Sequence, residues 1–239
     1  VFGQGWNGHF AFEENGSWGP KLDGKDRLWG NVVDDSQQIK PFKAQKNNLK
    51  DFYDVGKSFI NTLAISGGTD KATYYLSYSN VQEDGIVPAD NDSYKRNTLS
   101  FRGSTIGKKL FTSYSVNYVN KKSKYITTGQ GGAGATMYQE IIQIPVDMSI
   151  VDFKDYHNKF NNLDNYFTLY ATNPYFVLHE NGNDYEENRV FGNAQVDYEF
   201  TDWIKATTRV GGDIANSQLL DWIAIARTDP NSPNAGQTQ

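Results

Sequence analysis

Apolar and polar side chains alternate over long stretches of this sequence, and that period of two constrains the fold more than any other feature. In VFGNAQVDYEF, residues 190–200, the even positions are apolar or small and most odd positions are polar. After a short break the alternation resumes, with Ile204 and Val210 against Lys205 and Arg209. Successive side chains of a strand point to opposite faces, so each stretch predicts a strand with one apolar and one polar face.

Short turns alternate with long loops along the chain. Turn-forming residues stand at GGTD (67–70), IGKK (106–109) and FTDW (200–203), which predicts three hairpins at about 59–82, 95–122 and 188–216. Between them lie polar loops at about 83–94 and 123–187. A connection of about 65 residues is far longer than the usual loop of a compact domain. We therefore expect one end of the sheet to carry short turns and the other end to carry long loops.

The remaining segments give weaker signals. Residues 1–46 predict irregular loops with one strand near 8–13, and LLDWIAIART near the end predicts one more strand. A short helix is expected in NNLKDFYDVG, with Asn47 or Asn48 as its cap and Gly56 ending it in the left-handed conformation. Two further helices are expected at about 135–143 and 150–158.

Composition narrows the class of protein. No cysteine is present, which removes disulfides and thiolate metal sites, and the net charge of −5 argues against a nucleic-acid partner. No apolar run approaches the roughly 18 residues of a membrane-spanning helix. The chain begins at Val1 and closes on a polar tail, and we expect it to be part of a longer protein.

Two architectures fit the alternation. Strands of about 11–14 residues exceed the usual length and suffice to cross a bilayer when tilted. Aromatic residues near the strand ends resemble the girdles of an outer-membrane barrel. We therefore expect an all-β, antiparallel, up-and-down transmembrane β-barrel segment. The alternatives are a soluble, secreted β-sandwich whose loops bind a glycan, and an adhesin or surface-layer fragment.

Several longer stretches carry a family resemblance. They include SWGPKLDG, NNLKDFYDVGKSFINTLAISGGTDKATYYLSYSNVQEDGIVP, YKRNTLSFRGS, GQGGAGATMYQEIIQIPVDMSIVDFKDY and NPYFVLHENGNDYEENRVFGNAQVDYEFTDWIKATTRVGGD. In this order they closely resemble the SusC/RagA family of TonB-dependent outer-membrane transporters of Bacteroidetes-type bacteria. The resemblance implies that residues 1–239 supply about 6–7 strands of a barrel of about 22 strands and that the plug domain is absent.

The resemblance also implies a function. Such a barrel imports oligomeric nutrients, oligosaccharides or peptides, across the bacterial outer membrane and is not an enzyme. Its partners would be membrane lipid, a SusD-like surface lipoprotein and the TonB–ExbB–ExbD energising complex. The short turns would be periplasmic, and the long loops would face outward.

The position of each strand residue in the alternating pattern assigns it to one of two environments. The residues expected to face the lumen are Arg102, Gln195, Asp197, Glu199, Lys205 and Arg209. Those expected to face lipid are Tyr74, Leu76, Tyr78, Tyr114, Val116, Tyr118, Val196, Tyr198, Ile204 and Val210. Weak candidates for sugar-stacking platforms are Trp6, Trp18 and Trp29.

Other motifs do not support a second chemistry. GQGGAG at 129–134 matches G-x-G-x-x-G, but no βαβ unit surrounds it. DNDSYK at 90–95 lacks the glycine and glutamate of a calcium loop. His9, His157 and His179 do not form a zinc motif, and nothing selects a glycosidase pair among the carboxylates. We expect no catalytic residue, metal or cofactor, although a cation bound by the loop carboxylates Asp90, Asp92, Asp184, Glu186 and Glu187 stays open.

Overall fold

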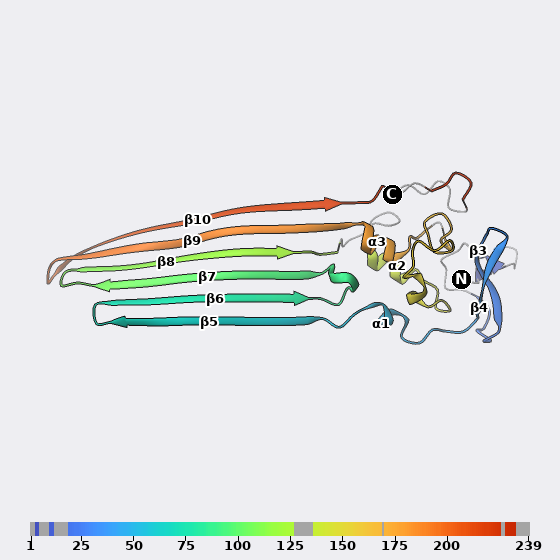
Figure 1. The fold of residues 1–239 in the computed structure, drawn as a ribbon, viewed down its shortest axis with the longest axis horizontal. Coiled ribbons are helices and arrows are strands. Elements are labelled where there is room, and N and C mark those ends of the chain that lie inside the picture. Colours follow the sequence, from blue (N-terminus) through green and yellow to red (C-terminus); the bar gives the residue numbers. More distant parts are fainter. Residues whose placement is uncertain are drawn as a thin grey trace.

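The computed structural model describes residues 3–4, 10–11, 19–126, 136–168, 170–225 and 228–232. A long antiparallel sheet occupies one end of the molecule, and a compact group of hairpins, short helices and loops occupies the other (Figure 1). We call this second part, which comprises the described residues outside the six long strands and their three short turns, the loop cap. Among the described residues, no helix has the length and apolar character needed to cross a membrane.

Six strands form the large sheet. They are β5 (Lys57–Thr69), β6 (Ala72–Asp84), β7 (Ser93–Ile106), β8 (Leu110–Ser123), β9 (Gly182–Thr201) and β10 (Ile204–Trp222). Their order in the sheet is β10-β9-β8-β7-β6-β5, so every strand pairs with its neighbour in sequence. The expected antiparallel, up-and-down arrangement is confirmed. β5 and β10 are the two edges and do not pair with each other, so the sheet is open.

The strands extend further than their sequence signals indicate. Gly67 and Gly68 pair with Tyr74 and Thr73 as part of β5 and β6, so the first turn consists of residues 70–71 and not of GGTD. Residues 219–222 continue β10 opposite β9, so the expected separate strand at LLDWIAIART is wrong. β9 likewise begins at Gly182, inside the expected loop, because β10 pairs with it along its whole length.

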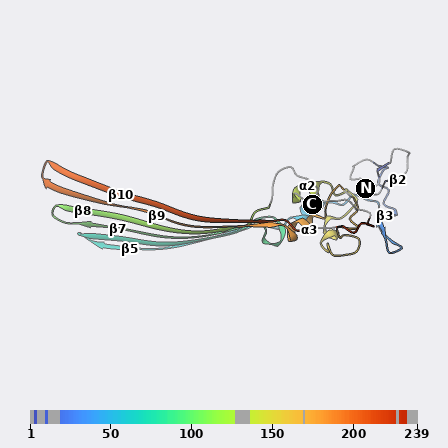
Figure 2. The ribbon, with the colours of Figure 1, turned by 90° about the horizontal axis from the view of Figure 1, so that it is seen from above.

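No described element packs against either face of the sheet. Figure 2 views the six strands nearly edge-on, with the loop cap beyond one end and open space on both sides. Nearly all side chains of β5 and β10 are exposed accordingly. The sheet therefore has no hydrophobic core of its own.

The loop cap begins with a hairpin that the sequence analysis missed. β3 (Asp26–Val33) pairs with β4 (Ser36–Pro41) within the segment expected to be irregular. Its turn residues Asp34 and Asp35 both have positive φ, the geometry of a type I′ turn more often made by Asn-Gly. A register shift between Trp29 and Val33 interrupts the alternation, which explains why the pattern gave no strand signal. Upstream, β1 (Gly3–Gln4) pairs with β2 (Phe10–Ala11), inside the expected strand near 8–13.

Short helices complete the loop cap. They are α1 (Asn48–Phe52), η1 (Pro88–Asp90), α2 (Met137–Ile142), η2 (Ile150–Phe153) and α3 (Pro174–Glu180), of which η1 and α3 were not expected. The expected ends of the first helix are wrong. Asn47 occupies the N-cap position but makes no side-chain cap, and the helix ends on extended Tyr53, so Gly56 is not its left-handed terminator.

The only large buried cluster among the described residues lies in the loop cap. The rings of Trp29, Phe153 and Phe167 pack against one another. The ring centroid of Trp29 lies 5.4 Å from that of Phe167 and 6.3 Å from that of Phe153. Phe52 joins from α1 and contacts Tyr175 of α3 at 5.1 Å. Segments distant in sequence thus share one aromatic core, which packs the described parts of the long excursion at 123–187 against β3 and α1.

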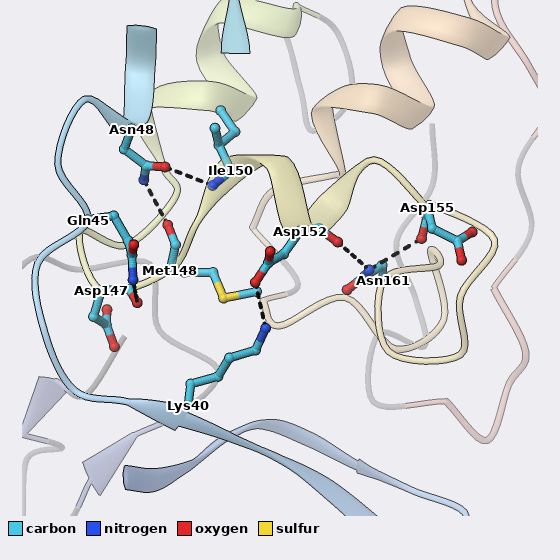
Figure 3. Close-up of polar contacts among 9 residues, drawn as sticks. All are labelled: Lys40, Gln45, Asn48, Asp147, Met148, Ile150, Asp152, Asp155 and Asn161. Carbon is cyan, nitrogen blue, oxygen red and sulfur yellow. Dashed lines mark hydrogen bonds and ion pairs between the residues drawn. The ribbon is translucent and has the colours of Figure 1, made fainter. Parts of the chain in front are cut away.

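Side chains of asparagine tie the cap loops together. Asn48 donates from Nδ2 to the Met148 carbonyl and accepts from the Ile150 amide, both at 2.7 Å (Figure 3). Asn161 donates to the carbonyls of Asp152 and Asp155, and Lys40 binds the Asp152 carboxylate at 2.7 Å. These contacts satisfy backbone groups that no helix or strand pairs. Asn48 therefore links α1 to η2 instead of capping its own helix.

Asn48→Ala should loosen this link. Met148 and Ile150 are buried, so their carbonyl and amide would lose their partner without gaining full hydration, at a cost of about 1–3 kcal/mol. We expect faster hydrogen exchange at the Ile150 amide, measured by NMR or mass spectrometry. Lys50→Ala, an exposed change in the same helix, is the control; equal protection of Ile150 in both variants would contradict the assignment.

The loop cap should lose stability at alkaline pH. Burial, aided by the nearby Asp54 carboxylate, raises the pKa of Tyr175 to about 12, against an ordinary value near 10. The neutral phenol is favoured in the folded cap, so its contribution is complete below about pH 10 and is lost as the pH rises toward 12. Urea midpoints followed by Trp29 fluorescence at pH 9 and 11.5 should fall less for Tyr175→Phe than for the wild type. An identical fall would show that Tyr175 does not contribute.

Candidate functional site

The register of the six strands places the apolar residues of every alternating pattern on one surface of the sheet, which we call the apolar face. Residues paired directly across strands point to the same side of a sheet. One row across the sheet consists of Leu63, Tyr78, Leu99, Tyr118, Val190 and Ile214. The next rows contribute Ile65, Leu76, Phe101 and Val116, and then Tyr74, Tyr114 and Val210. These large side chains are exposed, except for Leu76, which is half-buried.

On β9 the apolar face has the height of a bilayer's hydrocarbon band. Val190 and Phe200 of β9 are 200 − 190 = 10 residues apart, about 33 Å along a strand. A strand tilted by about 40° would cover about 25 Å of height with this stretch, which matches the apolar band of outer-membrane barrels.

Aromatic rings on the apolar face lie over glycines of neighbouring strands. A Cβ added to Gly103 would stand 2.4 Å from the Tyr114 ring, and one added to Gly67 would stand 2.6 Å from the Tyr74 hydroxyl. The rings of Phe101 and Tyr114 are 5.7 Å apart. The glycines therefore provide the space in which tyrosines lie flat along the sheet.

One row on the same face is made entirely of asparagine. Asn61, Asn80, Asn97, Asn120, Asn188 and Asn216 pair directly across all six strands, and we call them the asparagine row. The Asn97 side-chain oxygen accepts from Asn80 at 2.8 Å and from the Tyr78 hydroxyl at 2.7 Å. Asn188 accepts in the same way from Asn120 at 2.9 Å and from the Tyr118 hydroxyl at 2.8 Å. The row separates the apolar rows from the charged end of the strands.

The opposite surface, the polar face, is joined by ion pairs and hydrogen bonds. Arg189 donates from Nε to Asp213 at 2.8 Å, and Lys205 Nζ lies 3.5 Å from Asp197. Arg209 donates from Nε to the Gln195 oxygen at 2.9 Å. Ser and Thr hydroxyls of adjacent strands, such as Thr73 with Ser104, are also hydrogen-bonded. This face presents polar and charged groups to whatever lies beside it.

The residues that the alternating pattern assigns to the lumen or to lipid lie on opposite faces of the sheet. All six residues expected to face the lumen lie on the polar face: Arg102, Gln195, Asp197, Glu199, Lys205 and Arg209. On the apolar face lie Tyr74, Leu76, Tyr78, Tyr114, Val116, Tyr118, Val196, Tyr198 and Val210. Ile204 stands at the register shift that follows the last turn. Which solvent each face meets stays a prediction.

The tryptophan candidates do not gather into a ligand platform. Trp6 and Trp18 lie outside the described residues. Trp29 is 1% exposed and packs inside the aromatic core of the loop cap, so its faces are not open to a sugar ring. The GQGGAG motif also falls outside the described residues.

Three of the expected loop carboxylates belong to a strand. Asp184, Glu186 and Glu187 lie in β9, and Glu186 pairs with Lys122 at 3.2 Å. Asp90 and Asp92 stay in the short loop between β6 and β7, where Asp92 accepts from the Val87 amide at 3.1 Å. The described residues contain no group of three or more His, Cys, Asp or Glu side chains arranged to hold a metal ion.

Two histidines that are remote in sequence meet in the loop cap. His157 and His179 both contact the ring of Tyr156, with centroids 4.2 Å and 5.6 Å away. The Tyr156 hydroxyl donates to Glu180 at 2.8 Å, and burial with this contact raises the pKa of Tyr156. The phenol ring fills the space between the two imidazoles, so the arrangement is a packing cluster.

The asparagine row is the functional feature that the sequence analysis missed. Within the hairpins Asn61 pairs with Asn80, Asn97 with Asn120, and Asn188 with Asn216. Counting back from the turn at 70–71 gives the first pair, whereas the register shift at Ile204 prevents the same count from giving the last. The alignment between hairpins could not be found by counting, because long loops do not define register.

The chain was also compared with known proteins. No protein-family model matches the sequence, and no curated protein matches it. The two-faced sheet therefore carries the functional argument.

Gly103→Ala should disturb the apolar face more than Gly212→Ala. The new methyl group at residue 103 displaces the Tyr114 ring from its place beside Phe101, at a cost of about 1–3 kcal/mol. Gly212 lies on the same face with nothing within 4 Å of an added Cβ, so its replacement should be neutral or slightly stabilising. Urea unfolding followed by circular dichroism in detergent measures both. Equal midpoints for the two variants would contradict this account.

Proposed function

We propose that this chain is an internal barrel segment of a SusC/RagA-like transporter that imports oligosaccharides or peptides across the bacterial outer membrane. The observation that carries the proposal is the six-stranded sheet with one apolar and one polar face, neither covered by another described element. The sequence resemblance names the family, and the geometry of the sheet is independent of that resemblance.

The exposed apolar face supports a lipid environment. Val210 and Ile214 are 68% and 75% exposed, and similar side chains continue across all six strands. Proteins in water rarely expose a continuous apolar patch larger than a few hundred Å². Hydrocarbon would cover this surface without a second protein layer, and the proposal gives it that environment.

The polar face then borders a wet or plugged lumen. Its ion pairs, such as Arg189 with Asp213, need hydration or polar partners that lipid cannot provide. Arg102 lies over the Tyr75 ring, with 5.8 Å between the guanidinium carbon and the ring centroid, among Ser and Thr side chains of neighbouring strands. Such a surface suits a water-filled or plug-filled interior.

The two edge strands require closure. β5 and β10 each present unpaired backbone groups along 13 and 19 residues. In lipid every backbone N–H and C=O must be paired, so a membrane-spanning sheet has to close on itself. Under the proposal, further strands complete a barrel of about 22 strands.

The unequal ends of the sheet support an orientation. Three tight turns lie at one end, and the loop cap with its buried core lies at the other (Figure 1). In outer-membrane barrels the short turns are periplasmic and the long loops extracellular. The loop cap would thus form part of the outer rim on which a SusD-like lipoprotein rests, while TonB–ExbB–ExbD supplies energy from the inner side. Such transport changes no covalent bond of the cargo, and the proposal assigns no catalytic residue.

Spin labels on alternate residues of β9 test the proposal. Labels at Val196 and Tyr198 should relax faster in the presence of oxygen dissolved in lipid. Labels at Gln195 and Asp197 should instead relax faster in the presence of a water-soluble nickel chelate. The reason is that the two pairs occupy opposite faces of one strand. Electron paramagnetic resonance of the protein in outer-membrane vesicles gives the measurement.

The rival interpretation, a secreted glycan-binding module, makes the opposite prediction. It requires residues 1–239 to fold as a monomer in buffer without detergent. The transporter proposal predicts aggregation in buffer, because two open edges and an apolar face are uncovered.

A further inference from the structure

The asparagine row marks a sharp change of chemistry along the apolar face. On the turn side lie the rows of Leu, Ile, Val and Tyr described above. On the cap side the next row consists of Phe59, Gln82, Lys95, Lys122, Glu186 and Gln218. All six strands change from apolar to polar or charged at the same register position, except at Phe59.

The asparagine row has the chemistry of a membrane surface. The carboxamides bond to one another, and the hydroxyls of Tyr78 and Tyr118 point toward the cap end to reach Asn97 and Asn188. Tyrosine prefers the boundary where its ring is in hydrocarbon and its hydroxyl is hydrated. If the apolar face is in lipid, hydrocarbon therefore ends near Asn97 and Asn120 on the adjacent strands β7 and β8.

Three lysines lie just beyond that boundary. Lys95, Lys122 and Lys124 line one hollow of about 400 Å³, together with the carboxylates Asp184 and Glu186. Lys122 is paired with Glu186, whereas no ion pair within the described part of the chain involves Lys95 or Lys124. Both of these lysines also border a second hollow of about 350 Å³.

Their depth matches the headgroup layer. Lys95 stands two residues before Asn97, and Lys122 two residues after Asn120. Two residues of a tilted strand give a rise of about 5 Å, and the polar layer of each leaflet is about 5–7 Å deep. The long side chain of Lys124 can reach back toward the same layer.

We propose that this surface binds the phosphate groups of anionic lipids whose hydrocarbon chains cover the apolar face. The inference rests on the proposed function, because it requires lipid on that face. Lys95 and Lys124 supply positive charge that no ion pair of the described residues neutralises, although Glu83, Asp84 and Asp90 border the second hollow. Lys122, shared with Glu186, completes the first hollow. The hollow lies on the same face of the sheet as the apolar rows, separated from them by the asparagine row, and this favours a lipid over an acidic protein segment.

Flotation of the purified chain, diluted from detergent into vesicles, tests the inference. The vesicles contain phosphatidylcholine alone or with 30 mol % phosphatidylglycerol, and the test variant is Lys95→Gln/Lys122→Gln/Lys124→Gln. Each lysine at an anionic surface contributes about fivefold in affinity, so losing the charges of Lys95 and Lys124 should weaken anionic-vesicle binding about 25-fold. Binding to phosphatidylcholine vesicles should not change.

Two further variants serve as controls. Lys43→Gln/Lys46→Gln/Lys50→Gln removes the same charge from exposed lysines of the loop cap and should leave the preference for phosphatidylglycerol intact. Lys95→Arg/Lys122→Arg/Lys124→Arg keeps the charge and should bind as the wild type does. Inorganic phosphate at millimolar concentration should not compete, because lipid and not free phosphate is the proposed ligand.

The outcomes separate this inference from the proposed function. An unchanged preference for phosphatidylglycerol in the glutamine variant, or an equal loss on both vesicle types, overturns the headgroup site. A spin label at Leu99 that reports lipid in the same samples leaves the transporter proposal standing. A label at Leu99 that reports water overturns both. Competition by free phosphate would show an anion site without lipid selectivity and would also overturn the inference.

Discussion

Strand register is the constraint on which the rest of this structure depends. Side chains alternate with a period of two, so a slip of one residue between any two strands would move an entire apolar set to the other face. The backbone ladder holds Leu63, Tyr78, Leu99 and their partners in one row across six strands. Every property of the two faces follows from that alignment, including the row of asparagines and the ion pairs on the opposite side.

The molecule solves the problem of burial in two different ways. The loop cap buries Trp29, Phe153, Phe167 and their neighbours in a core assembled from segments distant in sequence. The sheet leaves residues of the same chemistry exposed, since its strands pair only edge to edge. A cap with its own core beside an uncovered sheet suits the proposed barrel segment, whose strands would be solvated by lipid and whose loops would lie in water.

Asparagine has separate tasks in these two parts. In the cap, Asn48 and Asn161 satisfy loop carbonyls and amides that regular structure leaves unpaired. In the sheet, Asn80 and Asn120 bond to asparagines of adjacent strands at the limit of the apolar rows. The same carboxamide thus fixes irregular backbone in one place and forms a polar boundary in the other, because it both donates and accepts.

The sequence by itself determined the strands, their antiparallel order and the division of residues such as Gln195 and Val196 between two faces, because a period of two is a local property of the chain. It did not reveal the β3–β4 hairpin, whose alternation is broken at Gly30, or the continuation of β9 to Gly182, which exists only because β10 pairs with it. The burial of Trp29, the meeting of His157 with His179 and the asparagine row across three hairpins were decided by tertiary structure alone. Long loops carry no register, and a core built from remote segments leaves no local pattern, so only the folded chain brings these residues together.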